Sequence, residues 1–190
     1  MDLGSALPVF WYRIVIDNPH RLVYNIKMKI DYDTVYHFDF TNRVKFGGLD
    51  EETINELLQD GRVASKFLER YVPLWFPELK FVDATGYDHV DVATGKRRWD
   101  LKGFTKRGAN YVPSNMLGAG RSINLQEAHD HANAIDYIFS DVVDFPKVKI
   151  RFKSGKDLVK EFPRGKIDFK YRQQLFDAEK IESEKTNTQV

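Results

Sequence analysis

The sequence contains no cysteine among its 190 residues. This excludes a disulfide framework, a zinc or iron–sulfur centre held by thiolates, and a cysteine nucleophile. The sequence also has no apolar run near the roughly 18 residues that a membrane span needs, and no basic segment leading into an apolar one at its N-terminus. We therefore expect a cytoplasmic protein that has no membrane partner.

The chain has almost no net charge, +1 from 29 Lys and Arg against 28 Asp and Glu, but its charges are unevenly spread. Residues 94–122 hold seven basic residues and one acidic residue, and residues 147–172 hold ten basic and three acidic residues. Since these two segments carry +6 and +7, the rest of the chain carries −12. This asymmetry is typical of a phosphate-binding face on an acidic body. The alternative is that the charges are solvated clusters on unrelated surfaces.

Length and composition favour one domain with a real core, because 42% of the residues are hydrophobic and 14% are aromatic. We expect a single domain over residues 1–182, with a β-rich N-terminal elaboration over 1–46 and a catalytic core over 50–172. Alternating apolar residues in 22–30 and 34–40 predict an antiparallel β meander in that elaboration. The polar segment 183–190 is expected to be a disordered tail.

The order of elements predicts a mixed α/β fold, a mixed sheet flanked by helices. Asp50 can cap a first helix, and a second runs over Arg62–Tyr71, with Pro73 and Pro77 bracketing the exit from it. Further helices are expected at 124–134 and 172–184. Strands are expected from Leu79, over 135–143, and over 147–152, where Lys147, Lys149 and Arg151 would form a basic outer row.

The most informative stretch is the hairpin predicted over residues 86–103, which turns at Thr94-Gly95-Lys96. On its returning strand, Asp100 and Lys102 are two residues apart, so both side chains project from one face, about 7 Å apart. Asp88, near the start of the hairpin, can be brought opposite Asp100.

Two carboxylates and an ammonium beside this local positive charge outline a metal-dependent phosphodiesterase site. Mg²⁺ prefers hard oxygen ligands, so Asp88, Asp100 and the carbonyl of Leu101 are candidate metal ligands, with a phosphate oxygen completing the shell. The cation would stabilise the charge that develops on phosphorus, and Lys102 would orient the attacking water. The alternative is a surface hairpin with an ordinary Asp–Lys pair.

Two motifs carry a resemblance to a known family: Gly86-Tyr87-Asp88-His89-Val90-Asp91, and Trp99-Asp100-Leu101-Lys102. Together they resemble the PD-(D/E)XK nuclease superfamily, and within it the small type II restriction endonucleases. The resemblance extends loosely over about 80 residues, from Arg62 to Val143. It implies a restriction-endonuclease-like core, catalytic roles for Asp88, Asp100 and Lys102, and hydrolysis of double-stranded DNA with Mg²⁺, for which Mn²⁺ can substitute. It also implies 5′-phosphate products and a homodimer.

The sequence departs from the family pattern at three points. Tyr87 stands where the family often has proline, and Asp100 where glutamate is commoner. Many members add a glutamate about four residues after a glycine on the preceding helix, but Ser65 has that place after Gly61. Glu56 or Glu69 could substitute, and the sequence favours neither.

Six further residues are candidates for DNA contacts. Lys106, Arg107 and Arg121 could hold phosphates, and Asn115 and Arg121 have the chemistry to read base edges. The alternative for these loop residues is a solvated connector. Lys147 and Lys149 could follow a phosphate backbone, or could protect a sheet edge.

Two other acid and histidine groups have simpler interpretations. Asp91 is three residues from Asp88 and so points to the other face of its strand, which favours a turn-capping role over metal binding. His129 and His131 are two apart on a predicted helix and diverge by about 200°, so they cannot readily share one ion.

The main hypothesis is therefore a sequence-specific, Mg²⁺-dependent DNA endonuclease. A repair nuclease or a junction resolvase of the same superfamily is an alternative. So is a non-catalytic nucleic-acid-binding module, which the missing helix glutamate favours, and a scaffold that binds a partner through its aromatic N-terminal sheet.

Overall fold

The computed structural model describes residues 28–113, 116 and 124–177. The expected N-terminal strands before residue 28, Asn115, Arg121 and the tail 183–190 lie outside these residues. The elements follow in the order β1 (Val35–Asp39), α1 (Glu51–Gln59), α2 (Gly61–Trp75), β2 (Leu79–Ala84), β3 (Tyr87–Asp91), β4 (Arg98–Phe104), β5 (Ala109–Asn110), α3 (Leu125–Ala134), β6 (Asp136–Asp141), β7 (Lys147–Ser154), α4 (Gly155–Glu161), β8 (Lys166–Ile167), the 3₁₀ turn η3 (Phe169–Tyr171) and α5 (Arg172–Phe176).

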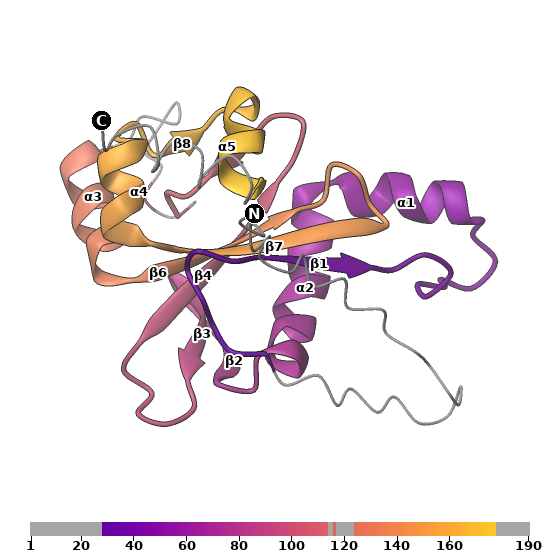
Figure 1. Ribbon diagram of the computed structural model, residues 1–190, viewed down its shortest axis with the longest axis horizontal. Helices are drawn as coiled ribbons and strands as arrows, with labels where there is room; N and C mark the ends of the chain where they lie inside the picture. The colour runs from indigo at the N-terminus through magenta and orange to yellow at the C-terminus, as the bar shows by residue number, and fades with distance from the viewer. Residues whose placement is uncertain (1–27, 114–115, 117–123, 178–190) are drawn as a thin grey trace, which may run out of the picture.

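Six strands form one mixed sheet in the order β1-β7-β6-β4-β3-β2, and β5 pairs with β8 in a small second sheet (Figure 1). Within the large sheet β4 and β6 are parallel, and the other neighbours are antiparallel. Strand β4, which carries Asp100 and Lys102, therefore lies inside the sheet between β6 and β3. The fold is mixed α/β, as predicted.

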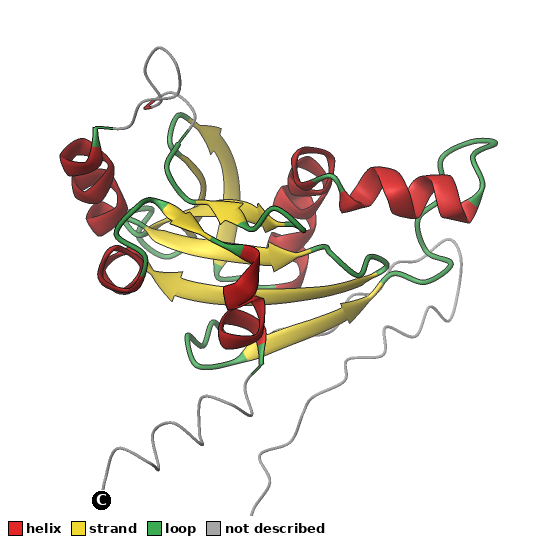
Figure 2. Cartoon of the chain, turned by 90° about the horizontal axis from the view of Figure 1, so that it is seen from above, coloured by secondary structure: helices red, strands yellow, loops and turns green. Residues whose placement is uncertain are grey.

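Helices cover both faces of the sheet, and each face has its own apolar core (Figure 2). Trp99 and Leu101 of β4 pack with α1 and α2 on one face. Phe104 and the neighbouring Tyr137 of β6 pack with α3, α4 and α5 on the other. Because successive side chains of a strand point to opposite faces, Asp100 and Lys102 lie on the second face, at the rim of its core.

Several predicted elements are confirmed. The side chain of Asp50 accepts from the N–H of Thr53 and caps α1, and Asn124 caps α3 through the N–H of Glu127. Strands are present at β2, β6 and β7, close to their expected bounds.

The helices differ from the predictions in two details. Helix α2 does not end before Pro73 but continues to Trp75, because its apolar stripe of Ala64, Leu68, Val72 and Trp75 is buried against the sheet and outweighs the local cost of the proline. Ser154 caps α4 through the N–H of Asp157, so a helix that was not predicted follows β7 directly.

The basic outer row predicted on β7 is only partly present. Lys147 is exposed, but Arg151 is buried and its guanidinium donates to the carbonyl of Leu175 at the end of α5, 2.8 Å away. The described part of the N-terminal elaboration also differs from a meander. Its strand β1 pairs with β7, more than a hundred residues later, and so forms one edge of the main sheet.

Helix α2 crosses β4 at a contact between two glycines. A Cβ atom added to Gly103 would lie 2.9 Å from the carbonyl oxygen of Gly61. This approach is possible only without a side chain, and it brings the first turns of α2 over the strand that carries Asp100 and Lys102. In the described part of the chain, no helix has the length and apolar composition needed to cross a membrane.

Candidate active site

Asp88 stands where strands β3 and β4 separate. The ladder between them pairs His89 with Trp99 and Val90 with Arg98. One residue beyond it, the Asp88 carboxylate accepts a hydrogen bond from the backbone N–H of Leu101, 2.9 Å away. A side chain thus takes the N–H that a continuing ladder would pair with backbone. The separation opens the sheet and leaves the carboxylate between the two strands.

Asp100 and Lys102 project from the same face of β4, as predicted, and form an ion pair with 2.7 Å between Nζ and Oδ2. The Asp100 side chain is only 6% exposed. Burial raises the pKa of Asp100 to about 7; the Lys102 ammonium opposes this rise, while the charge of Asp88 and a hydrogen bond with it add to the rise. Asp100 and Asp88 are therefore close enough to compete for one positive charge.

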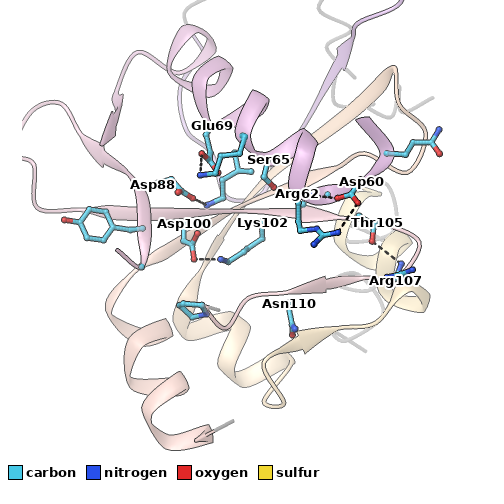
Figure 3. A pocket seen from close by; sticks show the side chains of 18 of the residues that line it. Asp60, Arg62, Ser65, Glu69, Asp88, Asp100, Lys102, Thr105, Arg107 and Asn110 are labelled. Carbon is cyan, nitrogen blue, oxygen red and sulfur yellow. Dashed lines mark hydrogen bonds and ion pairs between the residues drawn. The ribbon is translucent and has the colours of Figure 1, made fainter. Parts of the chain in front are cut away.

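These three residues lie in one pocket of about 1080 Å³ (Figure 3). Its floor is formed by Asp88 of β3 and by Asp100, Leu101 and Lys102 of β4. One wall is the start of α2 and the other is the turn between β4 and β5, so both walls come from segments that flank the hairpin in sequence.

The α2 wall contains residues that the sequence interpretation did not select. Arg62, Ser65, Lys66 and Glu69 all line the pocket. Their spacing of three and four residues places them on one helical face, and this polar stripe opposite the buried one was the available signal. Of the two acids considered as substitutes for the missing helix glutamate, Glu69 lines the pocket, and Glu56 is exposed on α1.

Glu69 is nearly buried, with 5% of its side chain exposed, and its Oε2 lies 2.9 Å from Nζ of Lys66. In Figure 3 Glu69 lies above Asp88, on the other side of the β4 strand from Lys102. A third carboxylate thus faces the same cavity. Its negative charge, which the more exposed Lys66 ammonium partly compensates, adds to the attraction of the pocket for a cation.

Two of the three predicted metal ligands suit a hard cation. Asp88 and Asp100 share a partly closed cavity, and burial, with a smaller contribution from the charge of Asp88, raises the pKa of Asp100, so a bound cation would favour its ionised form. Mg²⁺ needs only one or two carboxylates when water and phosphate complete its shell. Among the described residues, however, no group of three or more acidic or histidine side chains could hold one metal ion. Glu69 therefore lies apart from the pair.

The predicted DNA contacts are placed unevenly. Lys106 and Arg107 are exposed in the turn that forms the second wall of the pocket. Lys147 and Lys149 lie on β7, separated from β4 by β6, and are not among the residues that line the pocket. Lys149 is 3.6 Å from a carboxylate oxygen of Asp177.

The simpler interpretations of Asp91 and the two histidines are confirmed. Asp91 accepts from the N–H groups of Thr94 and Arg97 and so caps the hairpin turn. His129 contacts the carbonyl of Pro163 at 2.7 Å. His131 packs elsewhere, under Gly86, where an added Cβ would lie 2.9 Å from its Cε1 atom.

No protein-family model matches the chain, and neither curated proteins nor solved structures give a match.

Proposed function

We propose that the chain is a Mg²⁺-dependent endonuclease that hydrolyses phosphodiester bonds in double-stranded DNA, with a restriction-endonuclease-like core. The observation that carries this proposal is the shared pocket of Asp88, Asp100 and Lys102 at the point where β3 and β4 separate. This arrangement has the two oxygen ligands and the one ammonium that such a reaction needs.

The roles follow from charge and position. Asp88 and Asp100 would hold the Mg²⁺, which when bound supplies the positive charge that stabilises the transition state on phosphorus. Lys102 carries its ammonium at the floor of the pocket, where it can orient a water molecule for in-line attack. The ammonium of Lys102 is paired with Asp100 at 2.7 Å, and a cation held by Asp100 would weaken this pair and leave the N–H donors of Lys102 for that water.

The walls of the pocket support a polyanionic substrate. Arg62 and Lys66 extend from α2, with 94% and 69% of their side chains exposed. Lys106 and Arg107 are exposed on the opposite wall. The cations on both rims would attract the phosphates of the substrate. The acids on the floor would meanwhile hold the metal ion. Sequence specificity and a homodimer, which the family resemblance implies, are parts of the same proposal.

Incubation of the protein with supercoiled plasmid and with phage-sized DNA tests the proposal, with Mg²⁺, Mn²⁺ or Ca²⁺ as the added cation. We expect nicked and linear plasmid with Mg²⁺ or Mn²⁺, discrete fragments from the phage DNA, and 5′-phosphate ends. D88N and K102A should abolish cleavage and retain DNA binding. Unchanged nicking by either variant would contradict the assignment.

A panel of substrates separates the related activities. A restriction-like enzyme cuts linear duplex at defined sites, and a junction resolvase cuts a four-way junction far better than linear duplex. Sedimentation of the protein with and without DNA tests the homodimer, and a single chain per DNA would exclude it.

A non-catalytic nucleic-acid-binding module is the second candidate. It is favoured by the lack, in the part of the chain that the structure describes, of a cluster of three metal-binding side chains. It predicts salt-sensitive DNA binding without cleavage in any of the three cations, so the same incubation decides between the two.

A further inference from the structure

A proline in the middle of α2 frees one backbone carbonyl of that helix. In an α-helix the carbonyl of residue i accepts from the N–H of residue i+4. The residue four positions after Glu69 is Pro73, which lies inside α2 and has no N–H. The helix therefore cannot satisfy the Glu69 carbonyl in the ordinary way, and a buried carbonyl left without a donor is costly.

The donor to this carbonyl comes from strand β3. Nε2 of His89 lies 2.8 Å from the carbonyl oxygen of Glu69, and the His89 ring is fully buried against Phe81. Since a carbonyl oxygen only accepts, Nε2 carries the proton and the ring is the Nε2–H tautomer. Nδ1 is buried without a hydrogen-bond partner among the described residues. In the neutral Nε2–H tautomer this atom carries no proton, so no buried N–H is left without an acceptor.

This hydrogen bond joins two of the elements that supply acids to the pocket, α2 and β3. Its acceptor belongs to Glu69, whose carboxylate lines the pocket from α2. Its donor follows Asp88 directly in β3, and the Asp88 carboxylate lines the same pocket from the strand. Because neighbouring side chains of a strand point to opposite faces, His89 can face the helix while Asp88 faces the cavity.

We propose that His89 is a positioning residue: through the carbonyl that Pro73 leaves free, it ties α2 to β3 and fixes where the Glu69 carboxylate stands relative to Asp88. The inference rests on the proposed function, since it assigns the Glu69 charge a part in the cation affinity of the pocket. Residues behind metal ligands give such support in other sites, where their loss weakens metal binding about 10–100-fold; because Glu69 lines the pocket without being a proposed ligand, we expect an effect at the lower end of this range.

Four variants distinguish two roles of His89: positioning of α2 relative to β3, and only the supply of a hydrogen-bond donor to the Glu69 carbonyl. H89L removes the donor. H89Q keeps a donor at the place of Nε2. P73A supplies a backbone N–H that can bond the second lone pair of the Glu69 carbonyl within the helix while His89 keeps the first, so it is the matched control. H89L/P73A satisfies the carbonyl without any link to β3. The readouts are the melting temperature without metal, and Mn²⁺ affinity by calorimetry without DNA.

We expect H89L to lower the melting temperature and to weaken Mn²⁺ binding about tenfold, and H89Q to restore much of both. H89L/P73A should regain the melting temperature but not the Mn²⁺ affinity. P73A alone should bind Mn²⁺ as tightly as the wild type, and the comparison of H89L/P73A with P73A remains measurable if H89L alone does not fold.

Recovery of both properties in H89L/P73A would overturn the proposal, because His89 would then only satisfy a carbonyl. Equal Mn²⁺ affinities of H89L/P73A and P73A would overturn it as well. Failure of the proposed function has a different signature: the wild type would bind no Mn²⁺, or D88N would bind it as tightly as the wild type.

Discussion

Gly61 and Gly103 contact each other backbone to backbone where α2 crosses β4. A Cβ on Gly103 would lie 2.9, 3.0 and 3.3 Å from the carbonyl oxygen, Cα and carbonyl carbon of Gly61. A Cβ on Gly61 would instead meet the side-chain methyl of Thr105 at 2.9 Å. The two glycines are therefore needed for different reasons. A side chain at position 103 would clash with the backbone of α2, which cannot be removed, whereas one at position 61 would clash with a side-chain methyl group, which a substitution can remove.

We predict that G103A destabilises the protein by about 1–3 kcal/mol, because the helix must move away from the strand. G61A should also be destabilising, but G61A/T105S should recover most of the loss, since serine lacks the methyl that the new Cβ meets. G103A/T105S should show no such recovery. Chemical denaturation of the four variants measures this, and recovery in both pairs would contradict the geometry.

Asp88 has two roles, a structural one as acceptor of the Leu101 N–H and a proposed chemical one as metal ligand, and a suitable substitution can separate them. We predict that D88N keeps an oxygen acceptor for the N–H of Leu101 and so keeps the stability of the wild type, while losing cleavage. D88A leaves that N–H unpaired and should cost about 1–2 kcal/mol in addition. Thermal unfolding together with plasmid nicking tests this, and equal stability of D88A and D88N would show that the hydrogen bond contributes nothing.

The raised pKa of Asp100 predicts how stability depends on pH. Its ordinary value of 3.8 becomes about 7 in the fold, chiefly through burial. Between these two values the folded chain holds a proton that the unfolded chain has lost, so this group lowers the stability progressively as pH rises from about 4 to about 7. We predict that D100N, which cannot ionise, is more stable than the wild type at pH 8, and that this advantage disappears near pH 4.

Melting temperatures of the two proteins from pH 4 to pH 8 provide the measurement, and the difference between them isolates Asp100 from other titrating groups. A difference that does not vary with pH would contradict the prediction. Added Ca²⁺ at pH 8 should raise the melting temperature of the wild type and not of D100N, since ligand binding to the folded state stabilises it.

Local patterns in the sequence were enough to place the floor of the pocket. A turn at Thr94–Lys96 fixes the register of the hairpin. Asp100 and Lys102 share a face of the strand because they are two residues apart. The caps of α1 and α3 were also local, because a side-chain oxygen and an N–H three residues later suffice to make them.

The walls of the pocket depend on long-range packing and could not be predicted in the same way. Glu69 faces the pocket because α2 lies across β4 at Gly61, a contact between segments about 40 residues apart. Pro73 was a strong local signal for the end of a helix, but burial of Val72 and Trp75 overrides it. The alternating pattern of β7 predicts that Arg151 is exposed beside Lys147 and Lys149. It is buried instead, because α5 lies against it and accepts its hydrogen bond.

The two walls of the pocket predict which cations matter for DNA binding. R62A/R107A removes one charge from each wall, whereas K147A/K149A removes two charges from β7, outside the pocket. If the substrate lies between the walls, the first pair should weaken binding in Ca²⁺ uniformly across sequences. It should also reduce the slope of log affinity against log salt by about 2, since each lost phosphate contact removes about 0.9. The second pair should change that slope little. Equal losses in both would indicate that DNA also follows β7, as the alternation of Lys147 and Lys149 with apolar residues first suggested.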